Sequence, residues 1–164
     1  MQTTIETAMY QLGQVFLLPT LALIALLFLY AFWVLGAFAV QAWQRRRRAG
    51  RPLVQHYRLR PQASDDELDV QAHKLLEGAR IASRVTPMLG LVATMIPMGP
   101  ALRSLSDGNL ASVSDNLTVA FSAVILSLIA ASITYWVVNV RRRWLAEELL
   151  EIAALRRAAA GSAA

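Results

Sequence analysis

Residues 86–102 read TPMLGLVATMIPMGPAL, and this stretch decides the fold of the chain. It has no charged side chain in 17 residues, yet it holds three prolines, two glycines and two threonines. On a helix, at about 100° per residue, its small and hydroxyl-bearing side chains share one face and its bulky apolar side chains share the opposite face. The small face comprises Thr86, Gly90, Ala93, Thr94, Pro97 and Ala101. This division predicts a membrane helix whose small face meets protein or a pore and whose large face meets lipid or another helix.

The composition of the whole chain also indicates a membrane protein. Of its 164 residues 56% are hydrophobic, above the roughly 45–50% that is usual for soluble domains. Two further runs without charge, residues 15–43 and 117–140, exceed the ~20 residues that span a bilayer. The chain has no cysteine, which excludes a disulfide framework and a thiolate metal site.

We therefore predict an all-α membrane protein with three transmembrane helices, its N-terminus outside, its C-terminus cytoplasmic, and cytoplasmic helical extensions. Ser64, followed three residues later by Glu67, is a capping-box pattern that starts a helix in the middle insertion. The predicted order is 1–14, a periplasmic interfacial helix or a frayed terminus; 15–43, transmembrane helix 1; 44–85, a cytoplasmic insertion with an amphipathic helix; 86–105, transmembrane helix 2; 106–116, a periplasmic loop; 117–140, transmembrane helix 3; and 141–164, a cytoplasmic helix and tail.

The predicted orientation follows from the distribution of lysine and arginine. Of 16 such residues, ten lie between the first two spans, five follow the third, and only Arg103 belongs to the other side. Cytoplasmic segments carry this excess of positive charge, so the net charge of +5 indicates orientation rather than nucleic-acid binding. Alternatives for residues 45–48 are contact with anionic lipid or with nucleic acid. The predicted membrane-interface charges are Arg45, Arg46, Arg47, Arg48, Arg141, Arg142 and Arg143.

The third span carries hydroxyl groups on two faces. Thr118, Ser122 and Ser132 share one face with bulky isoleucines. The other face is small throughout, like the small face of the second span, and comprises Ala120, Ala123, Ser127, Ala130, Ala131 and Thr134. Two interpretations stay open for this second face: close helix packing, which small residues favour, or the lining of a polar path.

The three spans contain no Asp, Glu, Lys, Arg or His. A chain that moved protons alone would need a carboxylate or histidine within the membrane. The protein therefore either moves no ions or receives its titrating group from another chain. We find no nucleophile–base pair, phosphate-binding loop or metal cluster, and His56 and His73 have no ligand-spaced partner, so we predict neither an enzyme nor a cofactor or metal site.

The chain resembles the MotA/TolQ/ExbB proton channel family, and most closely its compact TolQ/ExbB-like members. Family members carry the signature P-x-LGLxGT in their second span, where this chain has residues 87–94, PMLGLVAT. The order of the spans, the cytoplasmic insertion, and a third span reading VAFSAVILSLIAASITYWVVN before arginines agree as well. The resemblance covers residues 75–145 well, and the first span by position only.

The resemblance implies a pentameric ring around single-span partner helices of the ExbD, TolR or MotB kind, whose membrane aspartate supplies the missing carboxylate. The family's second-span threonine falls on Thr94, and its third-span threonine falls on Val124, which has no hydroxyl. Ser127, one turn on, is the nearest hydroxyl. Either Ser127 substitutes, or the polar path is altered, or conduction is lost. The candidate pore-lining residues are Thr94, Ser127, Val124, Gly90, Thr86 and Ala131, with Thr118, Ser122 and Ser132 as the alternative hydroxyl face.

Two classes of function follow from these patterns. In the first, the chain is a subunit of an inner-membrane, proton-driven motor that couples ion flow to mechanical work in the envelope. In the second, it is a passive membrane scaffold or anchor, or an accessory subunit of a transporter, and it conducts no ions. The short insertion lacks the bulk of the torque-coupling domain of flagellar stators, which favours the TolQ/ExbB-like branch.

Overall fold

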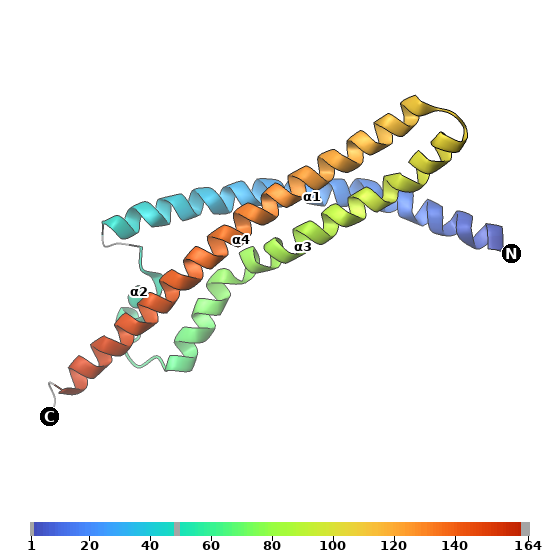
Figure 1. Ribbon diagram of the computed structural model, residues 1–164. Coiled ribbons are helices and arrows are strands. Elements are labelled where there is room, and N and C mark those ends of the chain that lie inside the picture. The colour runs from blue at the N-terminus through green and yellow to red at the C-terminus, as the bar shows by residue number, and fades with distance from the viewer. Residues whose placement is uncertain (1, 48–49, 162–164) are drawn as a thin grey trace. The chain divides into compact units, whose positions relative to one another are not determined.

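The computed structural model describes residues 2–47 and 50–161, and the described residues form helices and no strand. The helices are α1 (Gln2–Arg46), α2 (Pro52–Leu59), α3 (Asp65–Ser106) and α4 (Leu110–Gly161) (Figure 1). Three of them, α1, α3 and α4, are long and apolar enough to cross a membrane. The predicted fold class, all-α with three spanning helices, is confirmed. The chain is a multi-pass membrane protein.

The chain divides into two compact units, each of which takes parts of all three long helices. Unit 1 consists of residues 1–32 and 82–133, which include the second span and most of the third. Unit 2 consists of residues 33–81 and 134–164, which include α2 and the arginine-rich segments.

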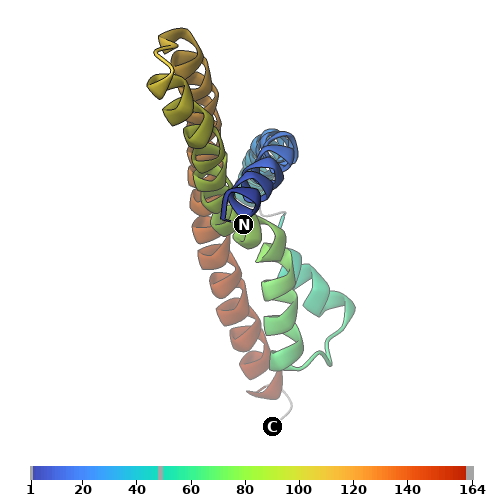
Figure 2. The same ribbon diagram turned by 90° about the vertical axis from the view of Figure 1, so that its right-hand side faces the viewer.

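In unit 1, α3 and α4 form an antiparallel helical hairpin, and the two helices run side by side in both views (Figures 1 and 2). Gly108 ends α3 with a φ of +74°, a left-handed conformation that glycine adopts without strain. The Asn109 N–H donates to the Ser104 carbonyl (2.9 Å) and the Gly108 N–H to the Leu105 carbonyl (3.1 Å), the bonding pattern of a Schellman cap. The Asn109 side chain then accepts the Ser112 N–H (3.2 Å) and caps the start of α4. Because the cap of α3 and the cap of α4 directly follow one another, only residues 107–109 between the two helices are non-helical.

Helix α3 contains three prolines, Pro87, Pro97 and Pro100, within one continuous helix. A proline inside a helix has no N–H to donate to the carbonyl four residues earlier. Its ring also crowds that carbonyl, so the helix bends or adjusts locally. The Ala93 and Ile96 carbonyls therefore lack the backbone N–H that would normally donate to them, because Pro97 and Pro100 stand four residues later.

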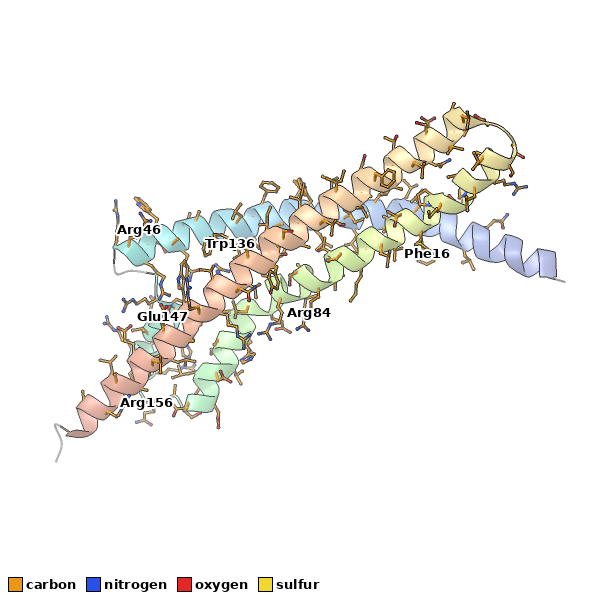
Figure 3. All side chains as sticks on the ribbon, in the orientation of Figure 1. Phe16, Arg46, Arg84, Trp136, Glu147 and Arg156 are labelled. Atoms are coloured by element: carbon orange, nitrogen blue, oxygen red, sulfur yellow. The ribbon has the colours of Figure 1, made fainter. Side chains whose placement is uncertain are left out.

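In unit 2, α2 packs against α3 and α4 around an apolar core. The core comprises Leu53, Val54, Ala63, Leu68, Ala72, Leu76, Leu145 and Ile152, with Tyr57 and Leu149 packed against it. The Ser64 hydroxyl accepts the Glu67 N–H at 3.1 Å, which confirms the predicted cap at the start of α3. Asp65 in the first turn of α3 pairs with Arg156, labelled near the C-terminal end of α4 in Figure 3.

Candidate functional site

The small faces predicted for the second and third spans are buried within protein. In α3 the buried positions recur at helical spacing and carry small side chains or none: Ala82, Thr86, Gly90, Ala93, Pro97 and Ala101. The matching positions of α4 in unit 1 are Ala120, Ala123, Ser127, Ala130 and Ala131. The large side chains of α3 are exposed instead, with Met88, Leu91 and Met95 each more than 60% accessible. This arrangement leaves the bulky face to lipid or to other chains and uses the small face to bring helices together.

Gly90 of α3 lies directly against Ser127 of α4. A Cβ added at Gly90 would lie 2.0 Å from the Ser127 Oγ and 3.0 Å from the Ser127 Cβ. A larger residue at this point therefore requires Ser127 or the helices to shift, since real Cβ atoms essentially never come closer than 3.0 Å to another heavy atom. One turn along α3, Ala93 packs with Ala123 of α4 and Ile24 of α1 in a small apolar cluster. The first span thus closes one side of the α3–α4 pair.

Ser127 and Thr86, two of the candidate pore-lining residues, lie inside this packed region. Ser127 is fully buried, and its hydroxyl donates to the Val124 carbonyl at 2.9 Å. Thr86 is 1% exposed and donates to the Ala82 carbonyl at 2.6 Å. Both hydroxyls satisfy their donor groups within their own helices, as serine and threonine commonly do in membrane spans. Ala131 is also buried.

Thr94 differs from the other small-face positions because it lies at the edge of the packed face and is partly exposed. Its hydroxyl donates to the Leu91 carbonyl at 2.7 Å. A hydroxyl has one donor and two acceptor lone pairs, so Thr94 in this conformation can still accept a hydrogen bond from outside the helix. Val124, another of the predicted pore-lining residues, is likewise partly exposed but has no polar group in its side chain.

The alternative hydroxyl face of α4 is exposed. Thr118, Ser122 and Ser132 donate to the carbonyls of Ser114, Thr118 and Leu128, each at 2.8 Å and each four residues earlier in α4. Their exposed neighbours are large apolar side chains such as Ile125 and Phe121. This face offers isolated hydroxyls on an apolar surface, whereas Thr94 lies at the edge of the small-residue face.

The profile of the MotA/TolQ/ExbB proton channel family matches residues 55–154, from within α2 through most of α4. The chain belongs to the MotA/TolQ/ExbB proton channel family. Comparison with curated proteins and with solved structures finds no match. The matched region contains the α3–α4 pair with Thr94 and Gly90, and it leaves the first span outside.

Unit 2 of this family member contains ion pairs at the arginine-rich end of α1. Arg45 contacts Glu148 at 2.6 Å and Glu147 at 3.3 Å, and its guanidinium lies 4.8 Å from the centre of the Trp144 ring. Arg47 lies over Trp43 at 4.2 Å. Figure 3 labels Arg46 at the end of α1 and Glu147 on α4.

The second group of predicted interface charges begins where the uncharged run of α4 ends. The Arg141 Nε donates to the Gln41 Oε1 at 2.9 Å, whereas Arg142 and Arg143 are exposed. The predicted interface residue Arg48 lies outside the described residues.

Glu148 is the buried charged residue that the sequence analysis did not single out. It is 1% exposed, accepts the Leu53 N–H at 2.9 Å, and so caps α2 from a different helix. Burial raises the pKa of the Glu148 carboxyl, and the Leu53 N–H, the Arg45 charge and the Val54 N–H oppose this rise. The signal in the sequence is its spacing, because Glu148 interrupts the apolar face between Leu145 and Ile152.

No group of three or more His, Asp or Glu side chains gathers among the described residues. The small faces of α3 and α4 present hydroxyl and carbonyl groups in an apolar helix pair. Such groups can hold water or hydrogen-bond a carboxyl group, but they do not ionise at ordinary pH.

Proposed function

We propose that this family member is a subunit of a proton-driven motor of the ExbB/TolQ kind in the inner membrane. In this proposal several copies, by analogy a pentamer, form a ring around the single span of a partner that carries a membrane aspartate. Proton flow through the partner's carboxyl group moves the partner, whose extracytoplasmic part does mechanical work in the envelope. The proposal rests on the family membership of the chain and on one observation about the spans.

The observation is that a half-exposed hydroxyl, Thr94, sits in spans that contain no ionisable side chain. The Thr94 hydroxyl already donates a hydrogen bond to the Leu91 carbonyl, so its oxygen can accept a hydrogen bond from a protonated carboxyl group or from water. An ionised carboxylate cannot donate such a bond. The proposed role of Thr94 is therefore to stabilise the protonated partner aspartate beside the ring, with the Ile96 carbonyl as a further acceptor for water.

The buried position of Ser127 gives it a different role in the proposal. Its hydroxyl is enclosed by the contact with Gly90, so it holds α3 and α4 together while Thr94 faces the ion route. Val124 then takes the place of the family threonine as an apolar wall. The ion route of this protein would pass fewer hydroxyls than the route of its relatives, and Thr94 would carry correspondingly more of the function.

The test is proton uptake by vesicles that contain the chain together with a single-span partner bearing a membrane aspartate. We expect Thr94→Val to lower partner-dependent uptake at least tenfold and to leave assembly intact. Thr118→Val is the matched control, because Thr118 also has a hydroxyl bonded to its own helix but lies on the exposed alternative face, and this variant should conduct normally.

Three other results would each redirect the proposal. Unchanged uptake by the Thr94 variant would mean that the ion route does not pass Thr94 on the α3–α4 pair. Loss of uptake in the Thr118 variant alone would place the route along the alternative hydroxyl face. No uptake by the unmodified chain with any such partner would favour the passive scaffold or the accessory transporter subunit.

A further inference from the structure

A cavity of about 340 Å³ opens within unit 2, where the end of α1, the start of α2 and parts of α3 and α4 meet. Its polar lining consists of Gln41, Gln44, Arg51, Gln55 and Arg141, and we call it the arginine–glutamine pocket. Aliphatic side chains that include Val40, Leu76 and Leu145 form its remaining wall. Its volume falls in the range of roughly 300–1,000 Å³ that is typical of small-ligand sites.

The polar lining of the pocket favours an anion. All five polar residues can donate hydrogen bonds through a guanidinium or an amide, and no carboxylate is among the described lining residues. Arg51 is held beside the cavity by Glu151, whose two carboxylate oxygens accept from its Nη1 at 2.7 and 2.5 Å.

Arg51 and Arg141 bring the two guanidinium groups of the lining, and Glu151 pairs with Arg51 at 2.5 Å. The N-terminus of α2 does not add to the attraction, because Glu148 already accepts the Leu53 N–H. A phosphodiester supplies several acceptor oxygens for these donors.

The pocket also lies at the height where lipid headgroups meet the protein. The uncharged run of α1 ends at Gln44, and that of α4 ends at Val140. The bond from Arg141 to Gln41 joins these two ends, and both residues line the pocket. Trp144, which also lines it, is a side chain typical of the membrane–water boundary.

We propose that the arginine–glutamine pocket binds the phosphodiester headgroup of an acidic phospholipid such as phosphatidylglycerol, with the start of its acyl chains along the aliphatic wall. Arg51 and Arg141 hold the phosphate, and the glutamine amides bond the hydroxyl groups of the headgroup. A zwitterionic phosphatidylcholine is disfavoured because the lining offers no carboxylate for its ammonium group. The site differs from the ion route and does not depend on conduction.

The test measures lipid retained by the purified full-length assembly after exchange in nanodiscs that contain equal amounts of phosphatidylglycerol and phosphatidylcholine. We expect phosphatidylglycerol to be retained at least fivefold over phosphatidylcholine. Arg141→Gln should abolish this preference, whereas Arg143→Gln, an exposed arginine two residues away, should keep it. Because the Arg141 variant also loses the bond to Gln41, Val40→Phe provides a second test that fills the cavity and keeps every charge.

Two results would overturn the proposal. Equal retention by the unmodified chain, the Val40 variant and the Arg141 variant would mean that surface arginines attract acidic lipid without the pocket. Displacement of phosphatidylglycerol by millimolar glycerol phosphate or inorganic phosphate would identify a site for a soluble phosphorylated ligand instead. Retention that persists in the presence of both soluble phosphates, and that fails in the Val40 variant, would support the lipid headgroup.

Discussion

The contact between Gly90 and Ser127 supplies a quantitative test of how α3 and α4 pack. Replacing Gly90 by alanine places a Cβ 2.0 Å from the Ser127 Oγ, against about 3.4 Å for an ordinary contact, a shortfall of 1.4 Å. Rotating the Ser127 hydroxyl away breaks its bond to the Val124 carbonyl, which costs about 1 kcal/mol. The Ser127 Cβ would still lie at 3.0 Å, so the helices must also separate by a few tenths of an ångström.

Overpacking of this kind costs about 1–3 kcal/mol, and the gain from replacing a helical glycine by alanine offsets about 0.5–1 kcal/mol of it. We therefore expect Gly90→Ala to lower the free energy of unfolding by about 1–3 kcal/mol. The measurement is reversible unfolding in mixed micelles. The control is Gly36→Ala in α1, where an added Cβ meets nothing within 4 Å and the change should be neutral or slightly stabilising.

The reciprocal exchange makes the test specific to this contact. Gly90→Ala combined with Ser127→Gly restores one side chain at the contact, so the double variant should be more stable than Gly90→Ala alone. The coupling free energy between the two positions should then be about 1 kcal/mol or more. Two results would refute the reasoning: a Gly90→Ala variant as stable as Gly36→Ala, or changes that simply add.

Two further predictions concern unit 2. Burial raises the Glu148 pKa above its ordinary value of 4.5, so the folded chain keeps this proton to a higher pH than the unfolded chain does. The stability that this proton contributes is present in full below about pH 4.5 and is lost as the pH rises through the raised pKa, so the thermal midpoint of unfolding should fall over that range. Glu148→Gln should remove this part of the pH dependence. A Glu148→Gln variant whose thermal midpoint varies with pH as in the unmodified chain would contradict the assignment. Ser64→Ala should lower the free energy of unfolding by about 0.5–2 kcal/mol through loss of the cap on Glu67, measured by thermal unfolding against Ser106→Ala at the other end of α3, which should change little.

The three spans and their small faces were within reach of sequence reasoning because helical periodicity and missing charge are local properties. The buried set in α3, from Thr86 to Ala101, follows the wheel drawn for residues 86–102. Thr94 is half-exposed although it shares that arc, because it lies at the edge of the face. A helical wheel gives the direction in which a side chain points, but it does not give how far a neighbouring helix extends over that side chain.

Other features depended on tertiary contacts that no periodicity encodes. The sequence left Ser127 open as a packing or a pore-lining residue, and its enclosure follows from the absence of a side chain at Gly90 on another helix. Glu148 is buried because α2 brings the Leu53 N–H to it across 95 residues of sequence. The arginine–glutamine pocket likewise combines residues from four helices, so their spacing in the sequence gave no sign of it.

A cryo-EM map of the purified assembly, prepared with a single-span partner, tests the central claim most directly. The account predicts several copies of the chain in a closed ring, a central helix from the partner, and Thr94 of α3 facing the partner's carboxyl group. A single copy of the chain whose Thr94 is covered by lipid would contradict it.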